Sequence, residues 1–185
     1  MRVLTKILMV GVLVAWALSL SSCLWFFSIF NKATVGGVDV ELTHAAVLDT
    51  GSAGDGTVTF IILMSDGLDY SGFSGVVGTG DAVMLIVLAD GTGLIEATYP
   101  FNDDPLGPPA LLGGEAIQTF DSVAGTVEAD IGIDTGEVII AEVMVGDWMI
   151  EWDCSGTDAV GGASATTTGK IRLSEDDIEF DSLDI

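Results

Sequence analysis

The chain reads TVTFIILM at residues 57–64 and AVMLIVLA at residues 82–89. Both stretches are nearly continuous runs of apolar residues, and segments rich in Gly and Asp flank both of them. A third run, EVIIAEVMV at residues 137–145, has the same character. Runs of this length and composition are typical of central β-strands that are buried on both faces of a sheet. The three stretches therefore predict a β-sheet domain.

Shorter stretches around these runs alternate between apolar and polar residues. Residues 38–43 and 148–153 do so, and the second stretch places both of its Trp residues on one face. A period of two predicts strands with one face inward and one face in water. Residues 170–173 and 178–181 alternate too, and predict a terminal hairpin. The segment 115–123 is compatible with a short helix or with a strand.

Segments that contain Asp and Gly separate the apolar runs and predict turns. Glycine adopts positive φ readily, and Asp side chains hydrogen-bond to nearby backbone groups. We expect hairpins over 82–98 and 127–145, a loop over the four prolines at 100–109, and a Gly/Ser/Thr-rich loop over about 154–168. The predicted turns are 49–51, 54–56, 65–67, 90–93 and 134–136.

Eight to ten short strands at regular spacing predict an all-β fold. We expect an antiparallel β-sandwich, Ig-like or similar, with a barrel as the alternative. Residues 38–185 are enough for a single domain with its own core, so two domains are not expected.

The N-terminal residues have the three parts of an export signal. Arg2 and Lys6 form a basic head, and an uncharged apolar run from Ile7 ends in LSSC at residues 20–23. This pattern resembles the signal peptide of bacterial lipoproteins, in which small residues precede the cysteine that receives the lipid.

The resemblance implies that residues 1–22 are a removable signal peptide and that Cys23 carries the lipid, palmitate included. It further implies that residues 23–37 form a lipidated tether. The expected partner is then the membrane, and the expected location is the cell envelope, outside the cytoplasm. Leu24 stands where an Asp would resemble the inner-membrane retention signal, which favours the outer membrane in a Gram-negative cell.

An uncleaved transmembrane anchor is the alternative to the lipid. Residues 7–30 contain no charge, and about twenty apolar residues suffice to cross the hydrocarbon core. With the basic head on the cytoplasmic side, this alternative also places the domain outside the cytoplasm.

Acidic residues dominate the chain beyond Cys23. All 28 Asp and Glu lie there, and the only cations are Lys32, Lys170 and Arg172. Such a negative field excludes nucleic acid as a partner, because binding to phosphates depends on Lys and Arg. The chain is nonetheless 49% hydrophobic, so we expect a folded core with acids on its surface. Solubility, adaptation to high salt and divalent-cation binding remain three explanations of the acidity.

Two acidic clusters are candidate calcium ligands, Asp103 with Asp104, and Glu175 with Asp176 and Asp177. Calcium takes about six to eight oxygen ligands, and neither cluster has the alternating spacing of an EF-hand loop. We therefore expect solvated acids and no cofactor, with calcium as the alternative.

One motif points to catalysis. AVLDTGSA at residues 46–53 resembles the active-site loop of retropepsin-type aspartic proteases, which dimerise so that two aspartates share one proton. In that family a Gly-rich flap and an apolar-apolar-Gly triplet follow, and residues 72–80 and 111–113 stand at similar separations. The resemblance implies Asp49 as the catalytic residue. The chain departs from the family after residue 113, and an Asp-Thr-Gly turn is the competing explanation.

Four further side chains have a structural and a functional interpretation. His44 is the only histidine, so we do not expect a catalytic triad or a His-rich zinc site, and we place it on a strand beside a threonine. We expect Trp148 and Trp152 to pack in the core, with a sugar-stacking platform as the alternative. Cys154 is expected to be a small buried hydrophobe rather than a reactive thiol.

Taken together, these features predict a lipid-anchored envelope protein that acts by binding or as a structural component. The protein or glycan partner is not identified. A retropepsin-type protease and a subunit of a surface filament or layer, built through an exposed edge strand, are the alternatives.

Overall fold

The computed structural model describes residues 31–52, 56–70, 76–90, 94, 96–102, 107–144, 147–174 and 178–182. These residues form eleven β-strands and no helix, which confirms the prediction of an all-β fold. The strands are β1 (Lys32–Val35), β2 (Val38–Glu41), β3 (His44–Ser52), β4 (Thr57–Tyr70), β5 (Val76–Asp90), β6 (Ala97–Pro100), β7 (Ala110–Asp121), β8 (Ala129–Met144), β9 (Asp147–Asp158), β10 (Ser164–Ser174) and β11 (Ile178–Ser182).

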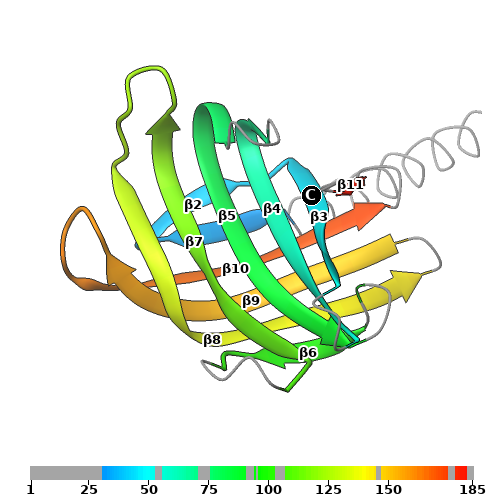
Figure 1. The fold of residues 1–185 in the computed structure, drawn as a ribbon. Helices are drawn as coiled ribbons and strands as arrows, with labels where there is room; N and C mark the ends of the chain where they lie inside the picture. Colours follow the sequence, from blue (N-terminus) through cyan, green and yellow to red (C-terminus); the bar gives the residue numbers. More distant parts are fainter. Residues whose placement is uncertain are drawn as a thin grey trace, which may run out of the picture. The chain divides into compact units, whose positions relative to one another are not determined.

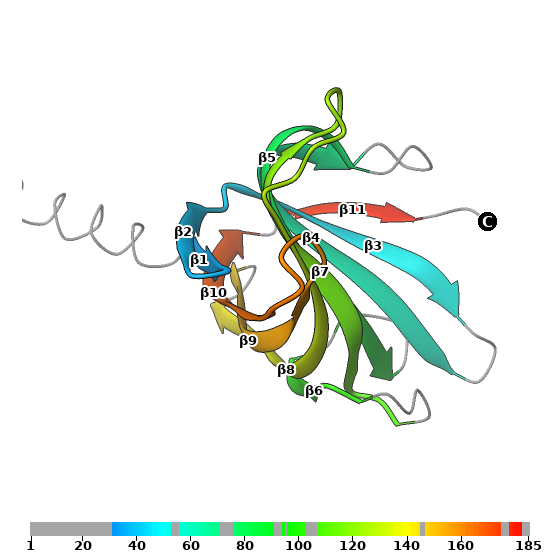
Figure 2. The same cartoon turned by 90° about the vertical axis from the view of Figure 1, so that its left-hand side faces the viewer.

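All eleven strands belong to one sheet. Ten of them follow the order β11-β3-β4-β5-β7-β8-β9-β10-β1-β2, and β6 pairs with β8 off this path. Every pairing is antiparallel except that of β11 with β3, which is parallel. The sheet curls into a half-barrel, in which β4, β5 and β7 cross in front of β9 and β10 (Figure 1). Figure 2 shows the same curl from the side.

The apolar core fills the inside of this curl. Trp152 of β9 and Tyr99 of β6 are its largest fully buried side chains. Strands β4 and β5 are buried on both faces as predicted, because Leu63 and Ala82 form a second small cluster opposite the main core. Strand β8 is different. Its inward residues are buried while Glu137 and Val143 are exposed, so the third apolar run alternates and has one wet face.

Three of the predicted turns are β-bulges inside continuous strands. The register shifts between Asp49 and Ser52 in β3, between Asp66 and Leu68 in β4, and after Ile133 in β8. The turns predicted at 49–51, 65–67 and 134–136, and with the last the hairpin over 127–145, are therefore wrong. A bulge uses the same residue types as a turn, since it also needs backbone with positive φ, and it increases the local twist. The bulges explain how strands as long as the 16-residue β8 can curl.

Other predicted connections fail because strand pairing here is non-local. Strand β5 ends at Asp90 as predicted, but β6 pairs with β8 and not with β5, so the hairpin over 82–98 is wrong. The terminal hairpin is wrong too, because β11 leaves β10 and pairs with β3. The loop predicted over 154–168 consists mostly of the end of β9 and the start of β10. The ambiguous segment 115–123 belongs mainly to strand β7.

The folded unit begins at Asn31 and not at residue 38. Residues 32–35, expected to belong to the tether, form β1, which pairs with both β10 and β2. The reason is that Ala33 and Val35 alternate with polar residues and are buried in the core. The loop predicted over 100–109 holds only in part, because Pro108 and Pro109 lie outside the strands whereas Pro100 is the last residue of β6. Pro100 is tolerated there because β6 pairs with β8 alone.

A charged depression on strands β1, β9 and β10

Strands β1, β9 and β10 carry a depression on the face that points away from the core. Along each strand, alternate residues such as Ala33, Trp152 and Ile171 point into the core. The residues between them therefore point outward. Seven outward side chains and the backbone beneath them line a depression of about 360 Å³, namely Lys32, Thr34, Asp39, Glu151, Asp153, Thr168 and Lys170 over Ala33, Trp152 and Gly169.

Strand register arranges these side chains in two rows across the sheet. In the first row, Lys32 of β1 stands opposite Lys170 of β10, which stands opposite Glu151 of β9. In the second row the order is Asp39, Thr34, Thr168 and Asp153, from β2 to β9. Two ammonium groups and two hydroxyls thus occupy the centre, and carboxylates flank them.

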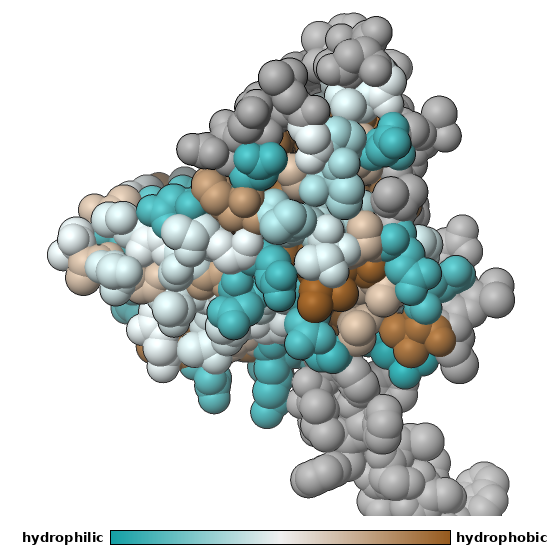
Figure 3. All heavy atoms as spheres, turned by 90° about the horizontal axis from the view of Figure 1, so that it is seen from below, coloured by the Kyte–Doolittle hydropathy of each residue, from teal (hydrophilic) through white to brown (hydrophobic). Residues whose placement is uncertain are grey.

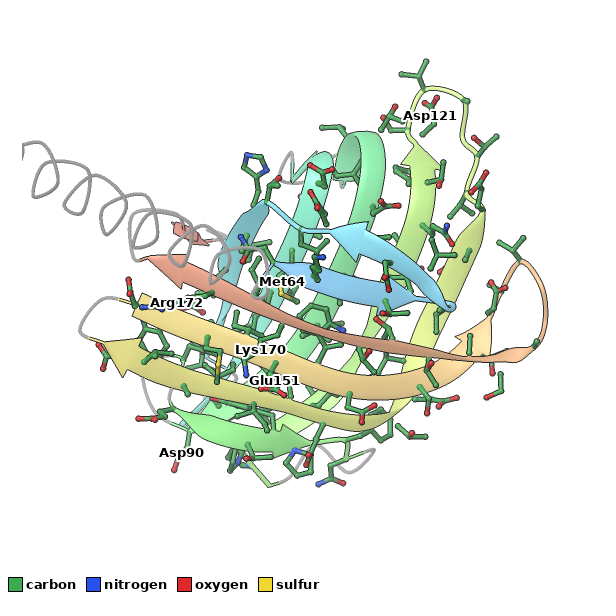
Figure 4. The ribbon with its side chains drawn as sticks, turned by 180° about the vertical axis from the view of Figure 1, so that it is seen from behind. Met64, Asp90, Asp121, Glu151, Lys170 and Arg172 are labelled. Atoms are coloured by element: carbon green, nitrogen blue, oxygen red, sulfur yellow. The ribbon has the colours of Figure 1, made fainter. Side chains whose placement is uncertain are left out.

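Some of these groups are paired with one another. The Lys170 Nζ lies 2.6 Å from the Glu151 Oε2, and the Thr34 hydroxyl donates to the Asp39 carboxylate at 3.1 Å. Figure 4 shows Lys170 and Glu151 side by side in the middle of β10 and β9. Arg172, further along β10, forms a second ion pair of 2.6 Å with Asp147 outside the depression. All three cations beyond Lys6 therefore lie on β1 and β10.

Three lining groups have no hydrogen bond or ion pair with any residue that the structure describes. They are the Lys32 ammonium, the Asp153 carboxylate and the Thr168 hydroxyl. Lys32 and Asp153 are exposed, and Thr168 is half-buried. The depression thus offers a free cation, a free anion and a free hydroxyl to a ligand.

Trp152 and Gly169 lie at the floor of the depression. The indole of Trp152 is buried, and its Nε1 donates to the buried Thr167 hydroxyl at 3.1 Å. Gly169 stands opposite Trp152, and a Cβ there would lie 2.3 Å from the indole ring. The close packing of the indole ring therefore requires glycine at position 169. The expectation that Trp152 packs in the core is confirmed, and Trp148 also packs against the core, where it is half-buried.

Apolar surface is scattered and suggests no competing site among the described residues. The exposed large apolar side chains there are five valines on separate segments, Val38, Val77, Val123, Val143 and Val160. On the face seen in Figure 3, hydrophilic residues surround small groups of apolar ones.

Asp49, the residue implied by the protease resemblance, lies within strand β3. Its partner across the sheet is Phe60 of β4, so the triplet 49–51 does not form the turn that presents a catalytic aspartate. The supporting triplet 111–113 lies on β7, and two strands separate β7 from β3. Asp49 and the supporting triplet 111–113 therefore do not lie on neighbouring strands.

The two predicted calcium clusters lie outside the described residues, since residues 103–106 and 175–177 are not among them. Within the described ranges, no group of three or more His, Cys, Asp and Glu is arranged to hold a metal ion. His44 is exposed at the start of β3, and its Nδ1 lies 2.8 Å from the Thr43 hydroxyl, as expected for a strand residue beside a threonine.

The two cysteines have separate environments. Cys154 is buried and free, and burial raises the pKa of its thiol to about 11. The prediction that Cys154 is buried is confirmed. Cys23, the predicted acylation site, lies outside the described residues.

Glu115 of β7 and Asp130 of β8 form a pair of carboxyl groups outside the depression. The pKa of Glu115 is raised to about 7, mainly by burial and in addition by a hydrogen bond with Asp130 and by the negative charge of that residue. The backbone N–H of Asp130 in turn donates to the Asp158 carboxylate at 3.1 Å. The pKa of Asp158 is lowered mainly by this bond. The Glu115 carboxyl group therefore changes charge near neutral pH.

No protein-family model, curated protein or solved structure matches the chain. In the part of the chain that the structure describes, no helix is long and apolar enough to cross a membrane.

The depression was not identified from the sequence. Lys32, Thr168 and Asp153 are distant in the chain, and only the pairing of β1 with β10 and of β10 with β9 brings them together. One signal was present. The scarcity of cations beyond Lys6 marks Lys32 and Lys170 as exceptions in an acidic chain.

Proposed function

We propose that the protein is a lipid-anchored domain of the cell envelope, held outside the cytoplasm by acylated Cys23, and that it acts by binding at the charged depression. The observation that carries the anchor is the LSSC motif at residues 20–23 after a basic head and an apolar run. The binding role is supported by a single depression in which Lys32 and Asp153 have no ion pair or hydrogen bond with any described residue.

The compact sheet unit starts at Asn31 and does not include Cys23. Cys154 is buried between β8 and β9 and donates to the Glu137 carbonyl, so it does not compete as an acylation site. One cysteine therefore has a packing role, and the other is left for the lipid.

We infer that the curled sheet is an open barrel, the alternative to a sandwich. The inference is supported by the unbroken order of ten strands around one core, with β2 and β11 as the open edges. Hydrogen exchange of backbone amides tests it. An open barrel predicts protected amides at the β7–β8 junction, where Ala116 pairs with Ile131. Rapid exchange on both strands at that junction would indicate two separate sheets.

Globomycin, an inhibitor of the lipoprotein signal peptidase, tests the anchor. Treated cells should accumulate a precursor that retains residues 1–22, and the Cys23→Ala variant, which has no thiol to acylate, should retain these residues without the drug. Cys154→Ala is the matched control and should be processed as usual. Normal processing in the presence of the inhibitor would reject the lipid anchor.

A further inference from the structure

We propose that the depression binds a zwitterionic ligand, with its oxyanion held by Lys32, Lys170 and Thr168 and its ammonium group held by Asp153. This proposal rests on the binding role proposed above and names the ligand class for that site. The ligand chemistry is that of a phosphate or carboxylate group linked by a short chain to an ammonium group.

Lys32 and Asp153 carry opposite charges at two sides of the depression. Lys32 on β1 and Asp153 on β9 are two strands apart in the sheet and two positions apart along it. With strands about 4.8 Å apart and residues about 3.3 Å apart, their Cα atoms are separated by about 12 Å. The two side chains do not pair with each other, so a ligand that carries both charges can bridge them.

Lys32 and Lys170 are directly opposite each other on one face, an arrangement that is destabilising for like charges. The carboxylate of Glu151 pairs with Lys170, whereas Glu41 of β2 stands opposite Lys32 on its other side and no ion pair joins these two described residues. An oxyanion between the two ammonium groups would remove this repulsion and accept a hydrogen bond from the Thr168 hydroxyl.

The mixed charges of the depression exclude ligands of a single charge. The depression has two ammonium groups and three carboxylates, those of Asp39, Glu151 and Asp153. A simple anion would meet the carboxylates, and a simple cation would meet the lysines. A zwitterion places each of its charges next to the opposite one, which favours it over both.

The ligand has two possible sources, a free metabolite or a lipid headgroup. Phosphoethanolamine has the required chemistry in both forms. The nine residues that follow Cys23, from Leu24 to Lys32, reach at most about 30 Å when extended. If Cys23 is acylated, headgroups of the same bilayer therefore lie within reach of the depression.

Lysine NMR of the full-length chain in detergent micelles tests the proposal. The chain has only three lysines, so reductive methylation with 13C-formaldehyde gives few signals and leaves the positive charges in place. Titration with phosphoethanolamine should shift the Lys32 and Lys170 signals along one saturating curve. Inorganic phosphate and ethanolamine should each bind at least about fivefold more weakly, since each retains only one of the two charged contacts.

Three variants make the test specific. Lys32→Gln should weaken phosphoethanolamine binding about tenfold, the loss expected for one charge-assisted hydrogen bond. Asp153→Asn should abolish the preference for phosphoethanolamine over phosphate. Arg172→Gln removes the same charge from β10 outside the depression and should change the affinity less than about twofold, because the charge of Arg172 is already paired with Asp147 and is screened at that distance.

Three results would overturn the proposal. They are signals that move no more than in sodium chloride of equal ionic strength, equal losses in Lys32→Gln and Arg172→Gln, or equal affinity for phosphate and phosphoethanolamine. Short-chain phosphatidylethanolamine in the micelles distinguishes the sources. If it shifts the same two signals, the ligand is a headgroup, and if only the free compound does so, the ligand is soluble. The titration needs no acyl group, so its failure and the failure of the lipid anchor are separate results.

Discussion

Two residues, Glu115 and Gly136, show how the local environment sets a pKa and the close approach of two strands. Glu115 retains its proton to about pH 7 because it is partly buried and shares a hydrogen bond with Asp130. Gly136 has a φ of +122° at a bulge where β8 touches β9. Each of these two residues gives a prediction that its environment dictates.

Glu115 should make the protein less stable as the pH rises towards neutrality. Its pKa is about 7 in the folded chain against an ordinary value of 4.5, so between these values the folded state holds more protons than the unfolded state. The free energy of unfolding should therefore fall from about pH 4.5 to about pH 7, and this contribution should level off above. Between pH 5 and pH 8, the free energy of unfolding measured in urea should decline less for Glu115→Gln than for the parent protein. Glu96→Gln, at an exposed acid outside the pair, is the control, and an equal change in both variants would contradict the assignment.

Gly136→Ala should destabilise the fold strongly. A Cβ at this position would lie 2.3 Å from the Asp153 carbonyl oxygen, and the positive φ is unfavourable for alanine. We expect a loss of about 2 to 4 kcal/mol in the free energy of unfolding. Gly132→Ala on the same strand is the matched control, because its nearest contact would be 4.0 Å away. If chemical denaturation gives equal losses for both variants, the close approach of β8 and β9 at the bulge is not what requires glycine.

At the element scale, the sequence predicted strands better than it predicted their partners. The apolar runs at 57–64 and 82–89 are strands because their composition and burial agree. The segment 65–67 was misassigned, since Asp and Gly serve a bulge as well as they serve a turn. The parallel pairing of β11 with β3 joins the last strand of the chain to the third, and no local pattern in the sequence predicts it. The depression depends on such pairings, so it could not be derived from spacing.

Strand β11 should protect the edge of β3 from other chains. It covers residues 45–49 of β3 by parallel pairing at one open end of the sheet. A chain that ends after Ser174 would expose that edge, and exposed edges pair with neighbours. Light scattering after size-exclusion chromatography in detergent should find self-association of the truncated chain and a monomeric parent. A parent that already forms filaments or rings would favour the surface-layer alternative, and a monomeric truncated chain would contradict the protective role of β11.

The most distinctive property of the whole molecule is its strong negative charge. The chain has a net charge of −23, and its described cations are confined to β1 and β10. Self-repulsion of that kind opposes compact structure and is screened by salt. The acidity predicted an exposed carboxylate surface, and the exposed Asp and Glu on β2, β8 and β9 agree with it.

Salt should therefore stabilise the protein, and calcium should add no more than its ionic strength. We expect the melting temperature to rise between about 0.01 M and about 1 M sodium chloride, as the Debye length falls from about 30 to about 3 Å. Millimolar calcium should match sodium chloride of equal ionic strength. A larger rise with calcium that a chelator reverses would indicate a cation site, because a ligand selective for the native state raises its stability.

The central claim is that Cys23 anchors an acidic, curled β-sheet domain to the outside of a bilayer. Intact-mass spectrometry of the protein purified from membranes tests it most directly. The account predicts a chain that starts at Cys23 and carries a diacylglyceryl group with its fatty acids. A chain that retains Met1, has no acyl mass and is recovered from the cytosol would contradict it.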